Sequence, residues 1–164
     1  MFKITIICIG KIKEEYIKNG ILEYEKRIKK FCDFKIIELK EELFNDNSKE
    51  QINKALEKEY LSVKNIINNS KENDKTFNIL LDINGEMIST LELEKKINYL
   101  KNYGINSINF IIGSSYGVFD KMNKIVNMKL SFSKFTFPHQ LFRLILIEQI
   151  YRILKISNNE KYHK

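Results

Sequence analysis

The residues best suited to chemistry lie in the last third of the chain. A mostly apolar, strand-like run at 108–112 ends in Gly113, and Gly117 follows four residues later. Glycines at the end of a strand can let a ligand approach the backbone. No Gly-Lys-Ser/Thr and no G-x-G-x-x-G pattern follows a strand, so the spacing does not indicate a phosphate loop. Taken alone, Gly113–Gly117 is more typical of a tight turn than of a binding site.

A second candidate is the apolar loop at 132–137, which reads Phe-Ser-Lys-Phe-Thr-Phe. Surface loops are normally polar, so this composition needs an explanation. Either the phenylalanines belong to the core, or the loop forms the wall of a pocket whose main-chain groups face a flat ligand. The sequence leaves both interpretations open.

Both histidines and a spaced ion pair also lie in this region. His139 falls in the first turn of the helix expected at 138–156, where a packing or capping role is favoured. His163 lies between Tyr162 and Lys164, and a terminal tripeptide of this kind normally has no fixed structure. Glu148 and Arg152 are four residues apart, which predicts an ion pair on one helix face with a structural role.

The positive charge is concentrated in the same part of the chain. The net charge is +7, and residues 129–164 contribute seven Lys or Arg against two Glu, a net +5. Such a surface attracts a polyanion, most commonly nucleic acid. A Lys-rich, AT-rich coding sequence would give a basic chain as well, and the charge alone does not separate these explanations.

Composition limits the class of protein. The chain has 164 residues and a 43% hydrophobic share, which fits one domain with a real core. Its apolar runs are too short for a membrane span, and it opens directly with a strand-like run, so we expect a cytoplasmic protein. Cys8 and Cys32 lack CxxC spacing and a paired histidine, which favours two buried thiols over a disulfide or a metal site.

Apolar strands alternate with helices along the whole chain. Strands are predicted at 3–9, 34–39, 77–83, 108–112 and 129–132, and helices at 14–30, within 40–76 after Ser48, and at 89–103, 119–126 and 138–156. Strands that are apolar on both sides predict an α/β fold, an open and mostly parallel sheet with helices on both faces. The carboxyl ends of such strands form the usual ligand site, which would gather Leu81, Gly113 and the loop 132–137.

The helix at 138–156 is apolar nearly all round. A helix of this kind must be buried on every side, which a surface helix of a single domain does not achieve. It therefore either runs through the interior or packs against another subunit.

Several segments together resemble one family. These are Lys3–Ile6 with Gly10-Lys11, Glu23–Arg27, Ile111–Gly113, Leu130–Ser133, Thr136–Gln140, Arg143, Glu148–Arg152 and Tyr162–Lys164. They are similar to the small bacterial ribosomal large subunit methyltransferases, SPOUT-class enzymes that modify N3 of a pseudouridine in 23S rRNA. The resemblance covers the whole chain and departs from the family at Ser114, where a second glycine is usual.

The resemblance implies a single SPOUT domain over residues 1–164, with a C-terminal trefoil knot mainly at 77–156 and a tail at 157–164. It implies an obligate homodimer with S-adenosylmethionine bound in the knot, no metal, and 23S rRNA of the ribosome as partner. The cofactor contacts carried over by matching positions are Leu81, Gly113, Phe132, Ser133, Lys134, Phe135, Thr136 and Phe137.

For catalysis we expect the tail of one subunit to close over the pocket of the other. His163 is the candidate base, because the target imide nitrogen must lose its proton. Arg152 and Lys164 would hold RNA phosphates or stabilise the imide anion, and Tyr162 belongs to the same tail.

Two other functions stay open at this point. A SPOUT methyltransferase acting on tRNA usually carries an added RNA-binding domain, for which this chain has no length. A non-catalytic, ribosome-associated RNA-binding factor would not need the intact loop 132–137. A nucleotide-binding regulatory module would need a phosphate-cradling loop.

Overall fold

The fold is a single five-stranded parallel sheet, seen in a computed structural model that describes residues 1–69 and 75–162. The strands lie in the order β2-β1-β4-β3-β5, and each neighbouring pair is parallel. The elements are β1 (Lys3–Ile9), α1 (Glu15–Ile28), β2 (Asp33–Leu39), α2 (Lys49–Asn68), β3 (Thr76–Met87), α3 (Thr90–Asn102), β4 (Ser107–Ile112), the 3-10 helix η2 (Asp120–Lys124), β5 (Met128–Ser131) and α4 (His139–Ser157). This confirms the predicted α/β class.

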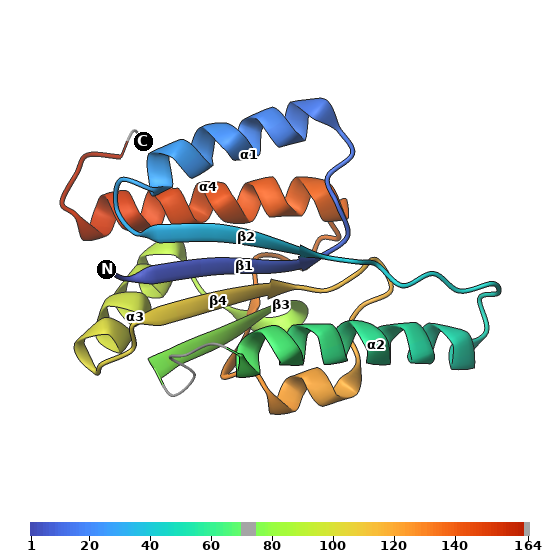
Figure 1. Ribbon diagram of the computed structural model, residues 1–164. Coiled ribbons are helices and arrows are strands. Elements are labelled where there is room, and N and C mark those ends of the chain that lie inside the picture. The colour runs from blue at the N-terminus through green and yellow to red at the C-terminus, as the bar shows by residue number, and fades with distance from the viewer. Residues whose placement is uncertain (70–74, 163–164) are drawn as a thin grey trace.

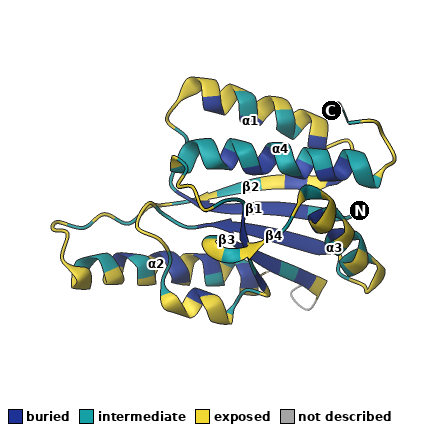
Figure 2. Ribbon diagram, turned by 180° about the vertical axis from the view of Figure 1, so that it is seen from behind, coloured by how far each residue is buried: buried dark blue, intermediate teal, exposed yellow. Residues whose placement is uncertain are grey.

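Helices cover both faces of the sheet (Figure 1). One face packs against α1, α3 and α4, through a core that includes Ile6, Phe110 and Ile147. The other face packs against α2 and η2, where Tyr60 and Met122 are buried. Apolar side chains project from both faces of β1 and β4 and pack under the helices on each side. These central strands are therefore buried almost throughout (Figure 2).

A row of hydrogen-bonded asparagines lies on the α2 side of the sheet and holds the segment that leads into β5. Asn109 donates from Nδ2 to Asn78 Oδ1 at 2.8 Å, and Asn78 donates from its own Nδ2 to the Ile125 carbonyl at 3.2 Å. Asn78 N–H also donates to Asn127 Oδ1 at 2.7 Å. Since these buried amides are paired, they tie the segment after η2 to the first residues of β3.

The third strand is longer than the sequence predicts. Asn84-Gly85 reads as a turn that ends the strand, but β3 continues to Met87 and pairs with β5 again after a register shift between Leu81 and Glu86. A Cβ at Gly85 would lie 2.7 Å from the backbone nitrogen of Leu130. The glycine therefore allows close approach of two backbones inside an irregular strand, and a strand end was the wrong interpretation.

The helix ends follow local signals closely. Ser48, after which a helix is expected, accepts a hydrogen bond from Gln51 N–H at 3.3 Å and so caps the start of α2. Ser89 and Glu92 form a reciprocal capping box at the start of α3, and Gly104 follows that helix with a φ of +86°. The helix expected at 119–126 is instead the shorter η2.

Two further expectations concern membranes and thiols. Among the described helices, none combines the length and apolar character needed to cross a bilayer. Cys8 and Cys32 are both free and buried, as predicted. Burial raises the pKa of each thiol to about 11, so both are protonated at neutral pH and are poor nucleophiles.

Candidate functional site

A cavity of about 610 Å³ lies where the carboxyl ends of β3, β4 and β5 meet. Its walls are the bulged part of β3, the turn after β4, the loop after β5 and the first turns of α4. Every residue expected from the sequence to contact a cofactor lines this cavity except Lys134, which is exposed. The volume falls in the range of small-molecule sites, and the position is the usual one for open parallel sheets.

The turn after β4 is tightly closed. Gly117 N–H donates to the Ser114 carbonyl at 3.0 Å, and Gly117 adopts a φ of +97°. A Cβ at Gly113 would lie 2.5 Å from Val118 Cγ1 and 2.7 Å from the Gly117 carbonyl oxygen. Ser114, where the family usually has glycine, does not adopt a positive φ. The tight turn favoured by the spacing is thus present, and it forms one wall of the cavity.

The bulged segment of β3 supplies a polar wall. Asp82 Oδ1 accepts a hydrogen bond from Asn84 N–H at 2.9 Å, and Asp82 Oδ2 lies 3.2 Å from Lys129 Nζ. These contacts hold the segment against β5 while it turns away from the regular ladder. The carboxylate is therefore partly neutralised at the edge of the cavity.

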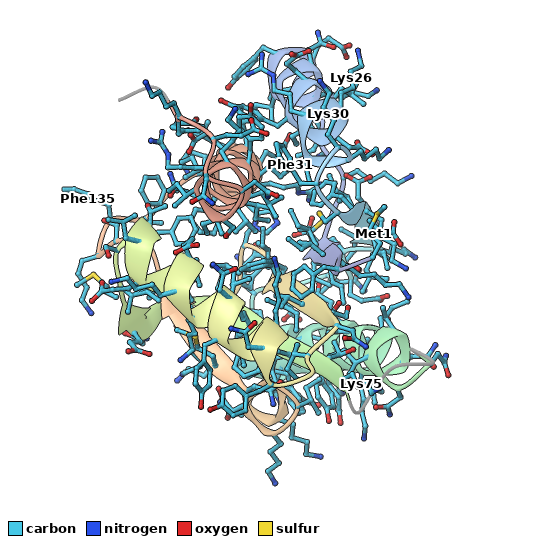
Figure 3. All side chains as sticks on the ribbon, turned by 90° about the vertical axis from the view of Figure 1, so that its left-hand side faces the viewer. Met1, Lys26, Lys30, Phe31, Lys75 and Phe135 are labelled. Carbon is cyan, nitrogen blue, oxygen red and sulfur yellow. The ribbon has the colours of Figure 1, made fainter. Side chains whose placement is uncertain are left out.

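The loop 132–137 combines both interpretations left open by its sequence. Phe132 and Phe137 pack against Phe142 of α4, with ring centroids 5.2 and 5.8 Å apart, so these rings are structural. Ser133 Oγ accepts a hydrogen bond from Phe135 N–H at 3.0 Å and fixes a local turn. Phe135 is 80% exposed and projects from the edge of the molecule (Figure 3). The same wall of the cavity therefore contains two packed rings, Phe132 and Phe137, and one solvent-exposed ring, Phe135.

The first turns of α4 hold the loop that follows β1. His139 Nε2 lies 2.9 Å from the Ile9 carbonyl oxygen, which agrees with the packing role favoured for this histidine. Arg143 is 1% exposed and donates from Nη1 to Glu38 Oε1 at 2.5 Å and from Nη2 to the Gly10 carbonyl at 3.0 Å. These contacts set the position of α4 at the cavity.

Three residues on and after α4 form a separate cluster at its other end. Arg152 donates to Glu148 Oε1 from Nη2 at 2.8 Å, which confirms the predicted pair. Tyr162 donates from its hydroxyl to the same oxygen at 2.5 Å, and Arg152 Cζ lies 4.0 Å from the centre of its ring. Burial and the bond to Glu148 raise the pKa of Tyr162 to about 12.

This cluster does not line the cavity of its own chain. Arg152 follows Phe142 by ten residues, about 15 Å of helical rise. Figure 1 shows α4 running back along the sheet from the carboxyl ends of the strands. The predicted candidates Arg152 and Tyr162 are therefore brought together with each other but not with the cavity. His163 and Lys164 lie outside the described residues.

Sequence reasoning missed three parts of the cavity wall. Asn84, Val118 and Phe142 line it, but none was singled out for a site role. Phe142 belongs to the apolar helix expected at 138–156 and stands one helical turn after Pro138. That spacing places it over the loop 132–137 and was the available signal.

The cavity suits a flat, partly apolar ligand. Aromatic rings and aliphatic strand ends give apolar walls, while the turn and the loop offer main-chain donors and acceptors. Within residues 1–69 and 75–162, no group of three His, Cys, Asp or Glu side chains could hold a metal ion.

Comparison with known proteins places the chain in a family. The family described as "Predicted SPOUT methyltransferase" matches residues 2–163. A protein of Fusobacterium nucleatum named "Ribosomal RNA large subunit methyltransferase H" is 54% identical over 161 residues, covering 98% of this chain and 99% of that protein. Proteins of the same name from Clostridium botulinum (strain Alaska E43) and Malacoplasma penetrans are each 46% identical, covering 98% and 99% of this chain and 99% of each relative.

One solved structure also shows a likeness. It is the SpoU methyltransferase AviRb from Streptomyces viridochromogenes, which has a TM-score of 0.43 and 5% identity and covers 94% of this chain and 60% of that one. The family match and the full-length relatives agree with the resemblance found in the sequence. The chain belongs to the SPOUT methyltransferase family.

Proposed function

We propose that this protein is an S-adenosylmethionine-dependent methyltransferase that methylates N3 of a pseudouridine in 23S rRNA. Relatives that match the whole chain carry the name ribosomal RNA large subunit methyltransferase, and the family is one of methyltransferases. A ribosomal substrate would be met in the cytoplasm. The basic C-terminal region supports a polyanionic partner.

The observation that carries this proposal is the cavity at the ends of β3, β4 and β5. Its volume of about 610 Å³ is adequate for a nucleoside-sized ligand, and its walls contain no phosphate-cradling sequence. Leu81, Gly113 and the loop 132–137 would hold the cofactor through apolar surface and main-chain groups. Lys134, which does not line the cavity, would contribute its backbone as a member of that loop.

The protein would mainly orient the cofactor and the target nitrogen and exclude water from the site. The bound sulfonium supplies the methyl group that is transferred. The closed turn at 113–117 and the rings of Phe132 and Phe137 give a rigid wall, so the target nitrogen would meet a fixed geometry. His163 would accept the proton of the imide nitrogen, and Arg152 would stabilise the resulting anion or hold an RNA phosphate. Tyr162 would keep Arg152 in place through their shared contact with Glu148.

A homodimer is part of this proposal, and the placement of these groups supports it. Arg152 on α4 and Tyr162 after it do not line the cavity of their own chain, so they would act in a site completed by a second copy. Leu141 and Ile145 of α4 are only half-buried, and Phe135 and Met87 near the cavity are exposed. A partner covering these apolar side chains would bury the helix as its composition requires.

The trefoil knot also belongs to the proposal. The segment 132–138 connects the end of β5 to the start of α4. The start of α4 contacts the end of β1, and β3 and β4 lie between β5 and β1 in the sheet. A chain that crosses the ends of these strands in this way supports threading of the C-terminal part through an earlier loop, a rare exception to unknotted topology.

The test has two steps. Calorimetry with S-adenosylmethionine should show binding by the purified protein. Mass spectrometry of rRNA from cells lacking the protein should show loss of one methylated pseudouridine, restored by adding back the wild-type chain. The absence of cofactor binding at high micromolar concentration, or an unchanged rRNA methylation pattern in the deletion strain, would contradict the proposal.

A further inference from the structure

Gln149 has no part in the function described so far, yet it connects two helices. It lies on α4, and both polar atoms of its side chain are used. Its Oε1 accepts a hydrogen bond from the Thr90 hydroxyl at 2.7 Å, and its Nε2 donates to Glu148 Oε2 at 2.7 Å. Because Thr90 is the first residue of α3, one amide joins α3 to the carboxylate that holds Arg152 and Tyr162.

The carboxylate of Glu148 is fully occupied. Its Oε1 accepts hydrogen bonds from Arg152 Nε at 3.2 Å, from Arg152 Nη2 at 2.8 Å and from the Tyr162 hydroxyl at 2.5 Å. A carboxylate has about four acceptor positions, and the bond from Gln149 to Oε2 fills the one that these donors leave. The terminal torsion of a glutamate is soft, so without that bond the carboxylate could turn away from its donors.

The pattern of donors and acceptors gives the Gln149 amide one orientation. A carboxylate only accepts hydrogen bonds, so the amide must turn its NH2 group toward Glu148. Its carbonyl oxygen then faces Thr90, whose hydroxyl must donate. Thr90 is itself well placed, because it follows Ser89, which forms the capping box with Glu92 at the start of α3.

Neither helix geometry nor helix packing requires this arrangement. Side chains one residue apart on a helix do not face each other, so α4 alone does not bring Gln149 onto Glu148. The two helices are also joined elsewhere, because the Ser157 hydroxyl donates to Glu94 Oε1 at 2.9 Å. The bond from Thr90 therefore does more than join α3 to α4: it orients the amide that holds Glu148.

We propose that Gln149 is a positioning residue for the methylation reaction: its amide, oriented by Thr90, fixes the Glu148 carboxylate and so the places of Arg152 and Tyr162. This inference rests on the proposed function, in which Arg152 stabilises the imide anion or holds an RNA phosphate. Gln149 does not line the cavity and acts only through Glu148.

The first experiment measures methylation of ribosomal substrate and, by calorimetry, the Kd for S-adenosylmethionine. Gln149→Met keeps the length of the side chain but removes both hydrogen bonds. We expect kcat/KM for the ribosomal substrate to fall about tenfold while the cofactor Kd stays at the wild-type value, because Arg152 is displaced and the cavity is not. Thr90→Val should act in the same direction, and Thr90→Ser, which keeps the hydroxyl, should recover most of the activity.

A second measurement reports the position of Arg152 without any methylation. The arginines of the chain are Arg27, Arg143 and Arg152, so their Nε–H resonances form a small set in an NMR spectrum. Loss of one resonance in Arg152→Lys assigns it. We expect this resonance to shift and to exchange faster with water in Gln149→Met and Thr90→Val, but not in Thr90→Ser, because the carboxylate that accepts this N–H becomes free to turn.

Ser157→Ala is the matched control, since it removes another hydroxyl between α3 and α4 without touching the cluster. A kcat/KM for Gln149→Met within about twofold of this control, or an unchanged Arg152 resonance, would overturn the inference. Equal losses in Thr90→Val and Thr90→Ser would overturn it as well. A wild-type chain without methylation would refute the proposed function, and the inference with it, whereas an active wild type and an equally active Gln149→Met would refute the inference alone. Should Gln149→Met fold poorly, the two Thr90 variants test the same bond.

Discussion

The two ends of α4 are built differently. At the first turns, Arg143 is fully buried and bonds Glu38 and Gly10, which come from the start of the chain. At the far end, Glu148, Arg152 and Tyr162 bond one another, and their side chains are partly open to solvent. Arg143 is thus held by distant parts of the chain, whereas the bonds that join Glu148, Arg152 and Tyr162 stay within α4 and the residues after it.

This difference indicates that one end of α4 has a structural role and that the other has a role in the reaction. The end at the cavity needs a fixed position, because it shapes a binding site together with three strands. The other end carries the groups proposed to meet RNA, and these gain from an arrangement that a partner or a substrate can engage. We therefore expect changes at the first end to affect stability most and changes at the second to affect activity most.

The largest effect should come from Arg143→Ala. The change removes a fully buried side chain together with its bonds to the partly exposed Glu38 and to the Gly10 carbonyl, and we expect a loss of about 3 kcal/mol in the free energy of unfolding. Urea denaturation measures it. Arg152→Ala is the matched control, because its ion pair is partly exposed and should contribute at most about 1 kcal/mol. Equal losses in the two variants would remove the distinction between the ends.

Deletion of residues 162–164 should show the opposite pattern. Methylation should fall about 100-fold, because the groups proposed to order the substrate are lost. The cofactor Kd should change little, since Tyr162 does not line the cavity of its chain. Calorimetry and a single-turnover assay on ribosomal substrate measure these two quantities. Full activity of the shortened chain would refute the proposed role of the tail.

The smallest effect concerns pH. Folding raises the pKa of Tyr162 to about 12 from its usual value near 10, so the folded state keeps a proton that the unfolded chain releases. The stabilisation from this tyrosine is complete below about pH 10 and is lost as the pH rises toward about 12. Relative to Tyr162→Phe, the wild type should lose less than about 1 kcal/mol, since the ring is half-exposed. Urea denaturation of both at about pH 9 and about pH 11 tests this, and parallel curves would contradict it.

Local signals explain how much of the fold was predictable. Apolar runs, Ser48, Ser89 and Gly104 located the elements within a few residues, because caps and periodicity act over a few positions. The extension of β3 was missed because Asn84-Gly85 has the composition of a turn. Only the backbone of β5, far along the chain, shows that the glycine allows close pairing.

In the candidate site, too, local patterns predicted some features, while others depend on contacts between distant segments. The spacing of Glu148 and Arg152 predicted their bond, but the addition of Tyr162 depends on the chain returning over α4. The partners of Arg143 result from contacts between distant segments, which no local pattern reveals. The resemblance supplied the residues around the cavity, while their arrangement came from the sheet order.

The hydrogen bonds between the start of α4 and the end of β1 have a consequence for biosynthesis. The first strand and the loop beside it are synthesised well before the helix that covers them, because His139 and Ile9 are 130 residues apart in the sequence. Until that helix emerges, the nascent polypeptide must leave one side of its central strands uncovered, at a stage when such surfaces are prone to aggregate. Complete covering of these strands therefore waits until α4 has been synthesised, and we expect the yield of this protein in cells to depend on chaperones that shield unfinished sheets.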